Sequence, residues 1–195
     1  MLTQSTLNPE LLSLTCAVAA AEAIGNPATI KWPNDILLSG KKVAGILLES
    51  SATPLVRHSN ATAHPCPVLE QTRRTYIVGI GINCHQRNES FPPELRPVAT
   101  SIDIERRSIC DRISLAKRLL TSLDHWLADA GQSPDQVIAR WRSLSTQLGR
   151  RVTLLFDGKK FAGNCIGVDP QNGLILQLDS GGIRIFPAAH TTIAM

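Results

Sequence analysis

The sequence predicts an α+β fold, in which helices cover a β-sheet, followed by a small β-barrel. Three observations lead to this class. An alanine-rich helix comes first, and apolar strands separated by a glycine turn follow within residues 29–83. Two further helical patterns lie within residues 111–144. Beyond residue 147 only short strands and closely spaced turns remain, which is typical of a small barrel. We therefore predict two domains, residues 1–146 and 147–195.

The first helix is bounded by residues that favour helix ends. Asn8 is a good N-cap, Pro9 suits the first helical position, and Gly25 ends the helix. The many alanines between them predict close packing against a sheet.

Two more helices are predicted from periodic apolar residues. One spans residues 111–130 and ends at Gly131, and the next begins at Ser133-Pro134. The second of these turns Val137, Trp141 and Leu144 inward. The apolar face of the first consists of Ile113, Ala116, Leu119, Leu120, Leu123, Trp126 and Leu127.

Strands are predicted from apolar runs bounded by turn residues. Residues 29–50 predict two strands around the Ser39-Gly40 turn, and another runs over residues 76–83. The segments 51–75 and 85–110 show neither the helical nor the strand repeat of apolar residues, so we predict irregular loops there. In the barrel the expected strands are Arg151–Phe156, Lys160–Val168, Leu174–Leu178 and Ile183–Phe186.

Composition and charge narrow the class of protein. The chain has 195 residues, 43% apolar and 18% charged, which is ordinary for a globular protein. The net charge of +4 suits anionic small molecules or an acidic protein partner, and is too small to indicate nucleic acid. The five cysteines show no CxxC spacing, which favours a reducing, cytoplasmic setting. With no signal-peptide pattern and no apolar run of membrane-spanning length, we expect no membrane partner.

The strand over residues 76–83 carries two glycines in its interior. Alternation places Ile77, Gly79, Gly81 and Asn83 on one face, opposite an apolar face that packs on the helices. Glycines leave a bare backbone floor, which favours a surface for a flat ligand. The alternative is close approach of another backbone or a bulge, and this strand alone does not decide between them. A dinucleotide fingerprint is excluded because the third glycine and the following helix are missing.

The second unusual feature is a lysine at the start of an apolar strand. Strict alternation places Lys42 on the same face as Ala44 and Ile46. A cation entering an apolar strand is costly unless an anion meets it, and a lysine ammonium suits a carboxylate or phosphate. Lys31 and Asp35 bracket the preceding corner with opposite charges. The alternative is a turn that carries ordinary solvated lysines.

Three motifs together resemble the catalytic domain of biotin protein ligases. They are Lys31-Trp-Pro-Asn-Asp35, Lys42-Val-Ala-Gly45-Ile-Leu-Leu-Glu49 and Gly79-Ile-Gly81-Ile-Asn83, in this order, and the barrel beginning Leu148-Gly-Arg-Arg matches as well. The resemblance covers nearly the whole chain except the 51–75 loop. It implies a mixed sheet flanked by helices, like that of class II aminoacyl-tRNA synthetases, and an SH3-like barrel.

The resemblance also implies a two-step reaction. Biotin reacts with ATP, with Mg²⁺ present, to give biotinyl-5'-AMP, which then acylates one lysine on the biotin carboxyl carrier domain of acetyl-CoA carboxylase. Neither nucleic acid nor a membrane is an expected partner. A free sheet edge would allow a homodimer.

The matched positions carry roles from the family. The resemblance implies that Lys42 contacts the biotin carboxylate and the α-phosphate, that Lys31 lies near the phosphates, and that Asp35 lies near the incoming lysine. Asn83 matches a residue that binds the nucleotide. The backbone is expected to meet biotin or the adenylate at Gly45, Gly79 and Gly81.

One departure from the family concerns the segment ahead of the first helix. The family has there a Ser/Thr-Thr-Asn segment, a glutamine and an Arg/Gly-rich loop, and none of them is found in this sequence. We expect a truncated N-terminus, from a start assigned too late rather than from degeneration. The alternatives are a non-catalytic binder of the carrier domain and a lipoate-type ligase. A second role as a transcriptional repressor would need an N-terminal helix-turn-helix, and we expect none because this sequence has no room for it.

Other candidate chemistry is not supported by spacing. No metal site is predicted, because no zinc pattern fits His58, His64, Cys66, Cys84 and His85. Cys84-His85 has no third partner that the sequence identifies, so a thiol nucleophile is not predicted either.

Overall fold

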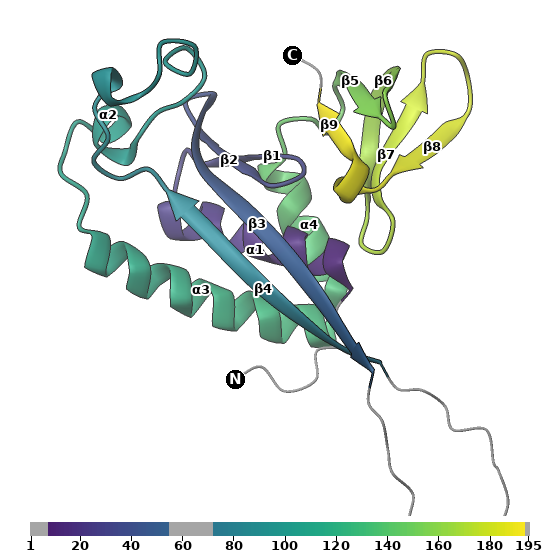
Figure 1. Cartoon of the computed structure of the whole chain (residues 1–195), viewed down its shortest axis with the longest axis horizontal. Helices are drawn as coiled ribbons and strands as arrows, with labels where there is room; N and C mark the ends of the chain where they lie inside the picture. The colour runs from purple at the N-terminus through teal and green to yellow at the C-terminus, as the bar shows by residue number, and fades with distance from the viewer. Residues whose placement is uncertain (1–7, 55–71, 194–195) are drawn as a thin grey trace, which may run out of the picture.

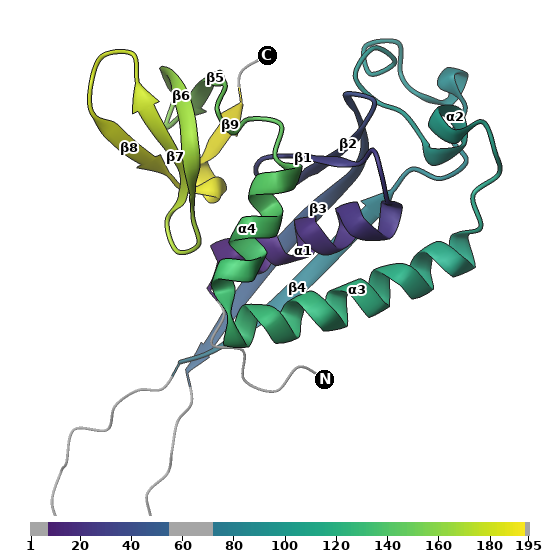
Figure 2. The ribbon, with the colours of Figure 1, turned by 180° about the vertical axis from the view of Figure 1, so that it is seen from behind.

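The computed structural model describes residues 8–54 and 72–193, and it is an α+β structure with two antiparallel sheets (Figure 1). Three helices cover one face of a four-stranded sheet, as the view from behind shows (Figure 2). A five-stranded sheet formed by the C-terminal residues lies to one side, next to α4 (Pro134–Leu144) and β1 (Thr29–Lys31). Three residues named above, His58, His64 and Cys66, lie outside the described residues. No helix in the described part is both long and apolar enough to cross a membrane.

Helix α1 (Pro9–Ile24) is the central element of the core. Its ends are as predicted: the Asn8 side chain accepts a hydrogen bond from the Leu11 N–H at 2.9 Å, and Gly25 follows at φ 85°. Alanines along the helix are almost fully buried, which allows the close approach to the sheet that small residues permit. At its C-terminus Arg118 Nε donates to the Ala23 carbonyl at 3.1 Å, so an arginine satisfies a carbonyl that the helix leaves unpaired.

Helices α3 (Arg112–Gln132) and α4 (Pro134–Leu144) pack against α1. Trp126 and Trp141 are buried, which confirms their interpretation as core residues. Glu22 of α1 joins the three helices, because it accepts from Trp126 Nε1 and from Arg140 Nε, each at 2.7 Å.

The predicted apolar face of α3 was partly wrong. Ile113, Ala116 and Leu120 are exposed, whereas Leu115 and Ala130, which the prediction omitted, are buried. The fully buried positions of α3 are Leu115, Trp126 and Ala130, and the helix packs there against α1 and α4.

The first sheet has four strands in the order β1-β2-β3-β4, all paired antiparallel. They are β1 (Thr29–Lys31), β2 (Asp35–Leu38), β3 (Lys41–Pro54) and β4 (Thr72–Ile82). We predicted two strands over residues 29–50, and the corner at residues 32–34 instead divides the first of them into β1 and β2. Parallel pairing, expected from a mixed sheet, is limited among the described residues to two isolated bridges.

The predicted loop over residues 51–75 was too long. Strands β3 and β4 continue their ladder as far as the pair Pro54–Thr72. The error has a simple cause, because backbone hydrogen bonds extend a hairpin without the apolar alternation by which strands are recognised.

A β-bulge in β3 overturns the predicted orientation of Lys42. Ile36 pairs with Ala44 but Leu37 pairs with Lys42, so Val43 is an extra residue. Val43 and Ala44 are consequently both buried, although they are neighbours. Lys42 therefore lies on the exposed face with Gly45, and not with Ala44 as strict alternation predicts.

The segment between β4 and α3 is more ordered than predicted. It contains a 3-10 turn (Asn88–Ser90) and α2 (Ile102–Arg106), whose N-cap Ser101 accepts from the Ile104 N–H at 3.3 Å. A helix of five residues is too short for periodicity to reveal. The segment also supports β3, since the Lys42 N–H donates to the Val98 carbonyl at 2.7 Å.

The second sheet agrees closely with the sequence. Its order is β8-β7-β6-β5-β9, and only the last strand was not predicted. The strands are β5 (Arg151–Phe156), β6 (Lys159–Asp169), β7 (Gly173–Leu178), β8 (Ile183–Phe186) and β9 (Thr191–Ile193). Hydrogen bonds that join residues 147–193 to the first part include Ala188 N–H to Glu10 Oε1 at 2.9 Å and Trp32 N–H to Gln147 Oε1 at 3.0 Å. The domain boundary at residue 147 stays a prediction.

Candidate functional site

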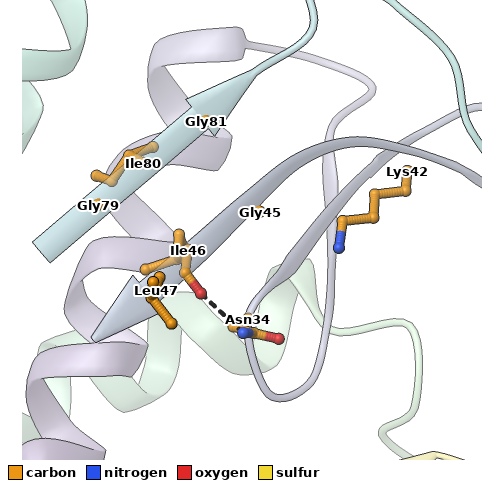
Figure 3. A pocket seen from close by; sticks show the side chains of 8 residues that line it. All are labelled: Asn34, Lys42, Gly45, Ile46, Leu47, Gly79, Ile80 and Gly81. Carbon is orange, nitrogen blue, oxygen red and sulfur yellow. Dashed lines mark hydrogen bonds between the residues drawn. The ribbon is translucent and has the colours of Figure 1, made fainter. Parts of the chain in front are cut away.

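An open hollow of about 550 Å³ lies where β3 and β4 meet the corner before β2 (Figure 3). Its floor belongs to the sheet face that the helices leave uncovered. The lining residues are Asn34, Lys42, Gly45, Ile46, Leu47, Gly79, Ile80 and Gly81. The hollow therefore contains the lysine and all three glycines that the sequence singled out.

The floor of the hollow is bare backbone. Gly45 lies directly opposite Gly81 across the β3–β4 ladder, and Leu47 lies opposite Gly79. A methyl group added to Gly81 would meet nothing nearer than the Gly45 carbonyl oxygen at 4.0 Å. No second backbone packs on these glycines in the described part of the chain, so that alternative explanation for them is not supported. The floor can accept a flat ligand.

The anion next to Lys42 is a side chain of this protein. Lys42 Nζ lies 2.5 Å from Asp35 Oδ1, and the side chains are 49% and 22% exposed. The bulge at Val43 brings the two side chains together. It turns Lys42 toward Gly45, and Gly45 is the ladder partner of Asp35. A charged group thus stands at the edge of an uncharged floor, where it can meet a carboxylate or phosphate.

Asn34 is a site residue that the sequence analysis did not single out. Its Nδ2 donates to the Ile46 carbonyl at 2.7 Å (Figure 3). The Ile46 N–H donates back to the Asn34 carbonyl at 2.9 Å. These two bonds fix the corner against β3. Its place between Pro33 and Asp35 in the first motif was the available signal. Leu47 was missed as well, although it lies two residues beyond Gly45 on the same face.

Three predicted site residues, Lys31, Asp35 and Asn83, do not line the hollow. Asp35 lies beside it through its contact with Lys42. Lys31 is the ladder partner of Asp35 in β1, and its side chain is only partly exposed. The Asn83 side chain points to the adjoining segment, where Nδ2 donates to the Thr100 carbonyl at 3.0 Å. The structure thus brings Lys42, Asp35 and the three glycines together, and places Lys31 and Asn83 around them.

The neighbouring Cys84-His85 pair has a partner that the sequence did not reveal. His85 Nδ1 lies 2.8 Å from Asp103 Oδ2, and this hydrogen bond holds the pKa of Asp103 below its ordinary value. Burial raises the pKa of the Cys84 thiol to about 11, with a contribution from the nearby Cys110 thiol. At neutral pH Cys84 is therefore protonated and a poor nucleophile. Among the described residues no group of three or more His, Cys, Asp or Glu is arranged to hold a metal ion.

Comparison with known proteins agrees with the geometry. The model of the Biotin/lipoate A/B protein ligase family matches residues 3–61. The biotin–[acetyl-CoA-carboxylase] ligase of Paracoccus denitrificans is 31% identical over 191 residues, which are 92% of this chain and 71% of that protein. The bifunctional ligase/repressor BirA of Bacillus subtilis is 32% identical over 184 residues, 91% of this chain and 51% of that protein. The chain thus spans about half the length of the Bacillus relative.

Solved structures show the same fold. A crystal structure of biotin protein ligase from Aquifex aeolicus matches with a TM-score of 0.75 at 25% identity, covering 96% of this chain and 75% of that one. The same Aquifex protein has been solved in complex with biotin and ATP. The fold and the hollow thus define a protein of the biotin and lipoate ligase class. Within that class, the chain belongs to the biotin protein ligase family.

Proposed function

We propose that this chain performs the ATP-dependent ligation of biotin, through biotinyl-5'-AMP, to a lysine of a biotin carboxyl carrier domain of acetyl-CoA carboxylase. The observation that carries the proposal is the Lys42 ammonium at the edge of the open floor formed by Gly45, Gly79 and Gly81. The Paracoccus relative is a biotin–[acetyl-CoA-carboxylase] ligase, which supports the choice of acceptor. The biotin carboxylate and the α-phosphate of ATP are both negatively charged where they react, and a single ammonium can stabilise both of them.

In the first step an oxygen of the biotin carboxylate forms a bond to the α-phosphorus of ATP, and the bond to pyrophosphate breaks. Negative charge gathers on the α-phosphate oxygens as this happens. Lys42 is held in place by its contact with Asp35, so its cation is positioned before the charge develops. A preorganised charge of this kind is worth about 10²–10³ in rate.

In the second step the amine of the acceptor lysine attacks the carbonyl carbon of the adenylate. The bond to AMP breaks, AMP leaves with the bonding electrons, and the amine loses a proton. Asp35 is 22% exposed beside Lys42, so its carboxylate can orient the amine or accept that proton. Lys31 and Asn83 lie around the hollow, where we propose that they meet the phosphates and the nucleotide.

Mg²⁺ is expected to arrive with ATP. This ion prefers oxygen ligands and keeps phosphate oxygens and waters around it. The site fits that mode, because Asn34 offers an amide oxygen in the hollow and Asp35, which pairs with Lys42 beside it, offers a carboxylate. When bound, Mg²⁺ would neutralise the charge of the leaving pyrophosphate.

Several finer expectations belong to the same proposal. The five-stranded C-terminal sheet is proposed to be an SH3-like barrel in a domain of residues 147–195, after a catalytic domain of residues 1–146. Its short strands and tight turns support this, as does the contact of the buried Phe186 ring with the half-buried rings of Phe156 and Phe161. The carrier domain as partner is proposed on the family resemblance, a homodimer on a free sheet edge, and a cytoplasmic location on the cysteine usage.

The test is a biotinylation assay with ATP, Mg²⁺, biotin and a purified carrier domain. We expect labelling of the carrier that disappears in Lys42→Ala. Binding of the carrier without labelling would instead indicate a non-catalytic binder. Preferential transfer of lipoate, when both acids are offered, would indicate a lipoate-type ligase.

A further inference from the structure

Lys42 lies across a glycine rather than over open space. A Cβ on Gly45 would stand 3.2 Å from Cε and 3.3 Å from Nζ of Lys42. Both distances are shorter than ordinary van der Waals contacts. Asp35 Oδ1 would be 3.9 Å from the same point. A Cβ at position 45 would therefore displace the end of the Lys42 side chain by a few tenths of an ångström.

The backbone does not explain the glycine at this position. Gly45 is not among the described glycines with a positive φ, so alanine can adopt its backbone conformation. The two other glycines of the floor differ in their surroundings. Gly79 faces the Leu47 side chain at 3.8 Å, and Gly81 faces only the Gly45 carbonyl. Of these three glycines, Gly45 alone meets Lys42.

We propose that Gly45 is a positioning residue for Lys42. The absence of a side chain there lets the ammonium lie across β3 and reach Asp35, and the bulge at Val43 directs Lys42 to that face. The catalytic consequence rests on the proposed ligase function. The placement of Lys42 rests on the geometry alone and can be tested without any reaction.

Gly45→Ala provides the test, and Gly81→Ala is the matched control. Both variants add one methyl group to the same floor at directly opposed positions, but only the first meets Lys42. The readout is the rate of lysine acetylation by limiting acetic anhydride, measured by mass spectrometry, with Lys41 as reference in the same molecule. Loss of an exposed ion pair predicts a rise of about threefold at Lys42 in Gly45→Ala. Gly81→Ala should label like the unaltered protein.

Asp35→Asn separates the lost contact from a general disturbance of β3. It leaves Gly45 intact and removes the anion, so it should raise Lys42 acetylation as well. Because both changes break the same contact, adding Gly45→Ala to Asp35→Asn should give no further rise. Additive effects, an unchanged rate in Gly45→Ala, or an equal rise in Gly81→Ala would each overturn the proposal.

The labelling result and the ligase result can fail independently. If the proposed function is also correct, Gly45→Ala lowers the rate constant of adenylate formation about tenfold or more, because the cation is displaced from the developing charge. Absence of ligation by the unaltered chain contradicts the proposed function and leaves the labelling outcome intact. Unchanged labelling contradicts the positioning role even in an active enzyme.

Discussion

The two faces of the four-stranded sheet differ in what their residues do. On the covered face Ile36, Val43 and Ala44 are almost fully buried against α1 and its neighbours. On the open face, glycines alternate along β4 and one charged pair stands beside them. One face thus contributes packing, and the other keeps a space free at some cost in strand stability. The bulge at Val43 makes this division possible, because it separates a lysine from the apolar residues that surround it in the sequence.

The largest effect is expected from truncating a residue of the covered face. Ile36→Ala should lower the free energy of unfolding by about 2–5 kcal/mol, because Ile36 is fully buried and a cavity would remain. Urea unfolding followed by circular dichroism measures it. The matched change on the open face is Leu47→Ala, where the side chain is 60% exposed and a loss below about 1 kcal/mol is expected. Similar losses in both variants would contradict the division between the faces.

The opposite pattern is expected for Lys42→Ala. Adenylate formation, measured by release of pyrophosphate, should fall about 10²–10³-fold, because a positioned cation is lost. Stability should change by less than about 1 kcal/mol, because an exposed ion pair contributes little. If Lys42 stabilised the fold instead, Lys42→Ala would shift the urea midpoint strongly and leave the rate of adenylate formation unchanged.

Filling the floor tests whether the bare backbone is used. Gly81→Val places a branched side chain in the hollow opposite Gly45, where there is room for it. We expect biotin binding, measured by calorimetry, to weaken by about 1–3 kcal/mol from steric overlap. Stability should hold or rise, since valine favours strands more than glycine does. Unchanged affinity would mean that the ligand does not lie on this floor.

The same comparison shows what the sequence can and cannot predict. In the C-terminal sheet, four of the five strands were predicted to within about a residue, because turn residues such as Asp157-Gly158, both at positive φ, separate them. The glycine face of β4 was also predicted, since alternation is unbroken there. The face of Lys42 was not, because one extra residue at Val43 reverses the alternation and leaves no local signal in the sequence. The Asp35–Lys42 contact follows from that bulge, so it could not be predicted from the sequence either.

The smallest effect concerns a charge on the covered side. Burial raises the pKa of Glu10 above its ordinary value of 4.5, against the lowering effect of the Ala188 N–H bond. The folded protein therefore holds this proton more tightly than the unfolded chain does. Stability from this group is present below the ordinary value and falls as pH rises through the raised pKa.

Glu10→Gln removes this titration and keeps an oxygen that can accept from Ala188. Its stability relative to the unaltered protein should therefore increase between about pH 4 and pH 7. Because Glu10 is only half-buried, the change should stay below about 1 kcal/mol. Urea midpoints at both pH values measure it, and Glu10→Ala, which also loses the acceptor, serves as the control. A relative stability of Glu10→Gln that falls over this range would show that the Ala188 hydrogen bond to the ionised carboxylate outweighs burial, and that the link between α1 and the C-terminal sheet depends on the charge.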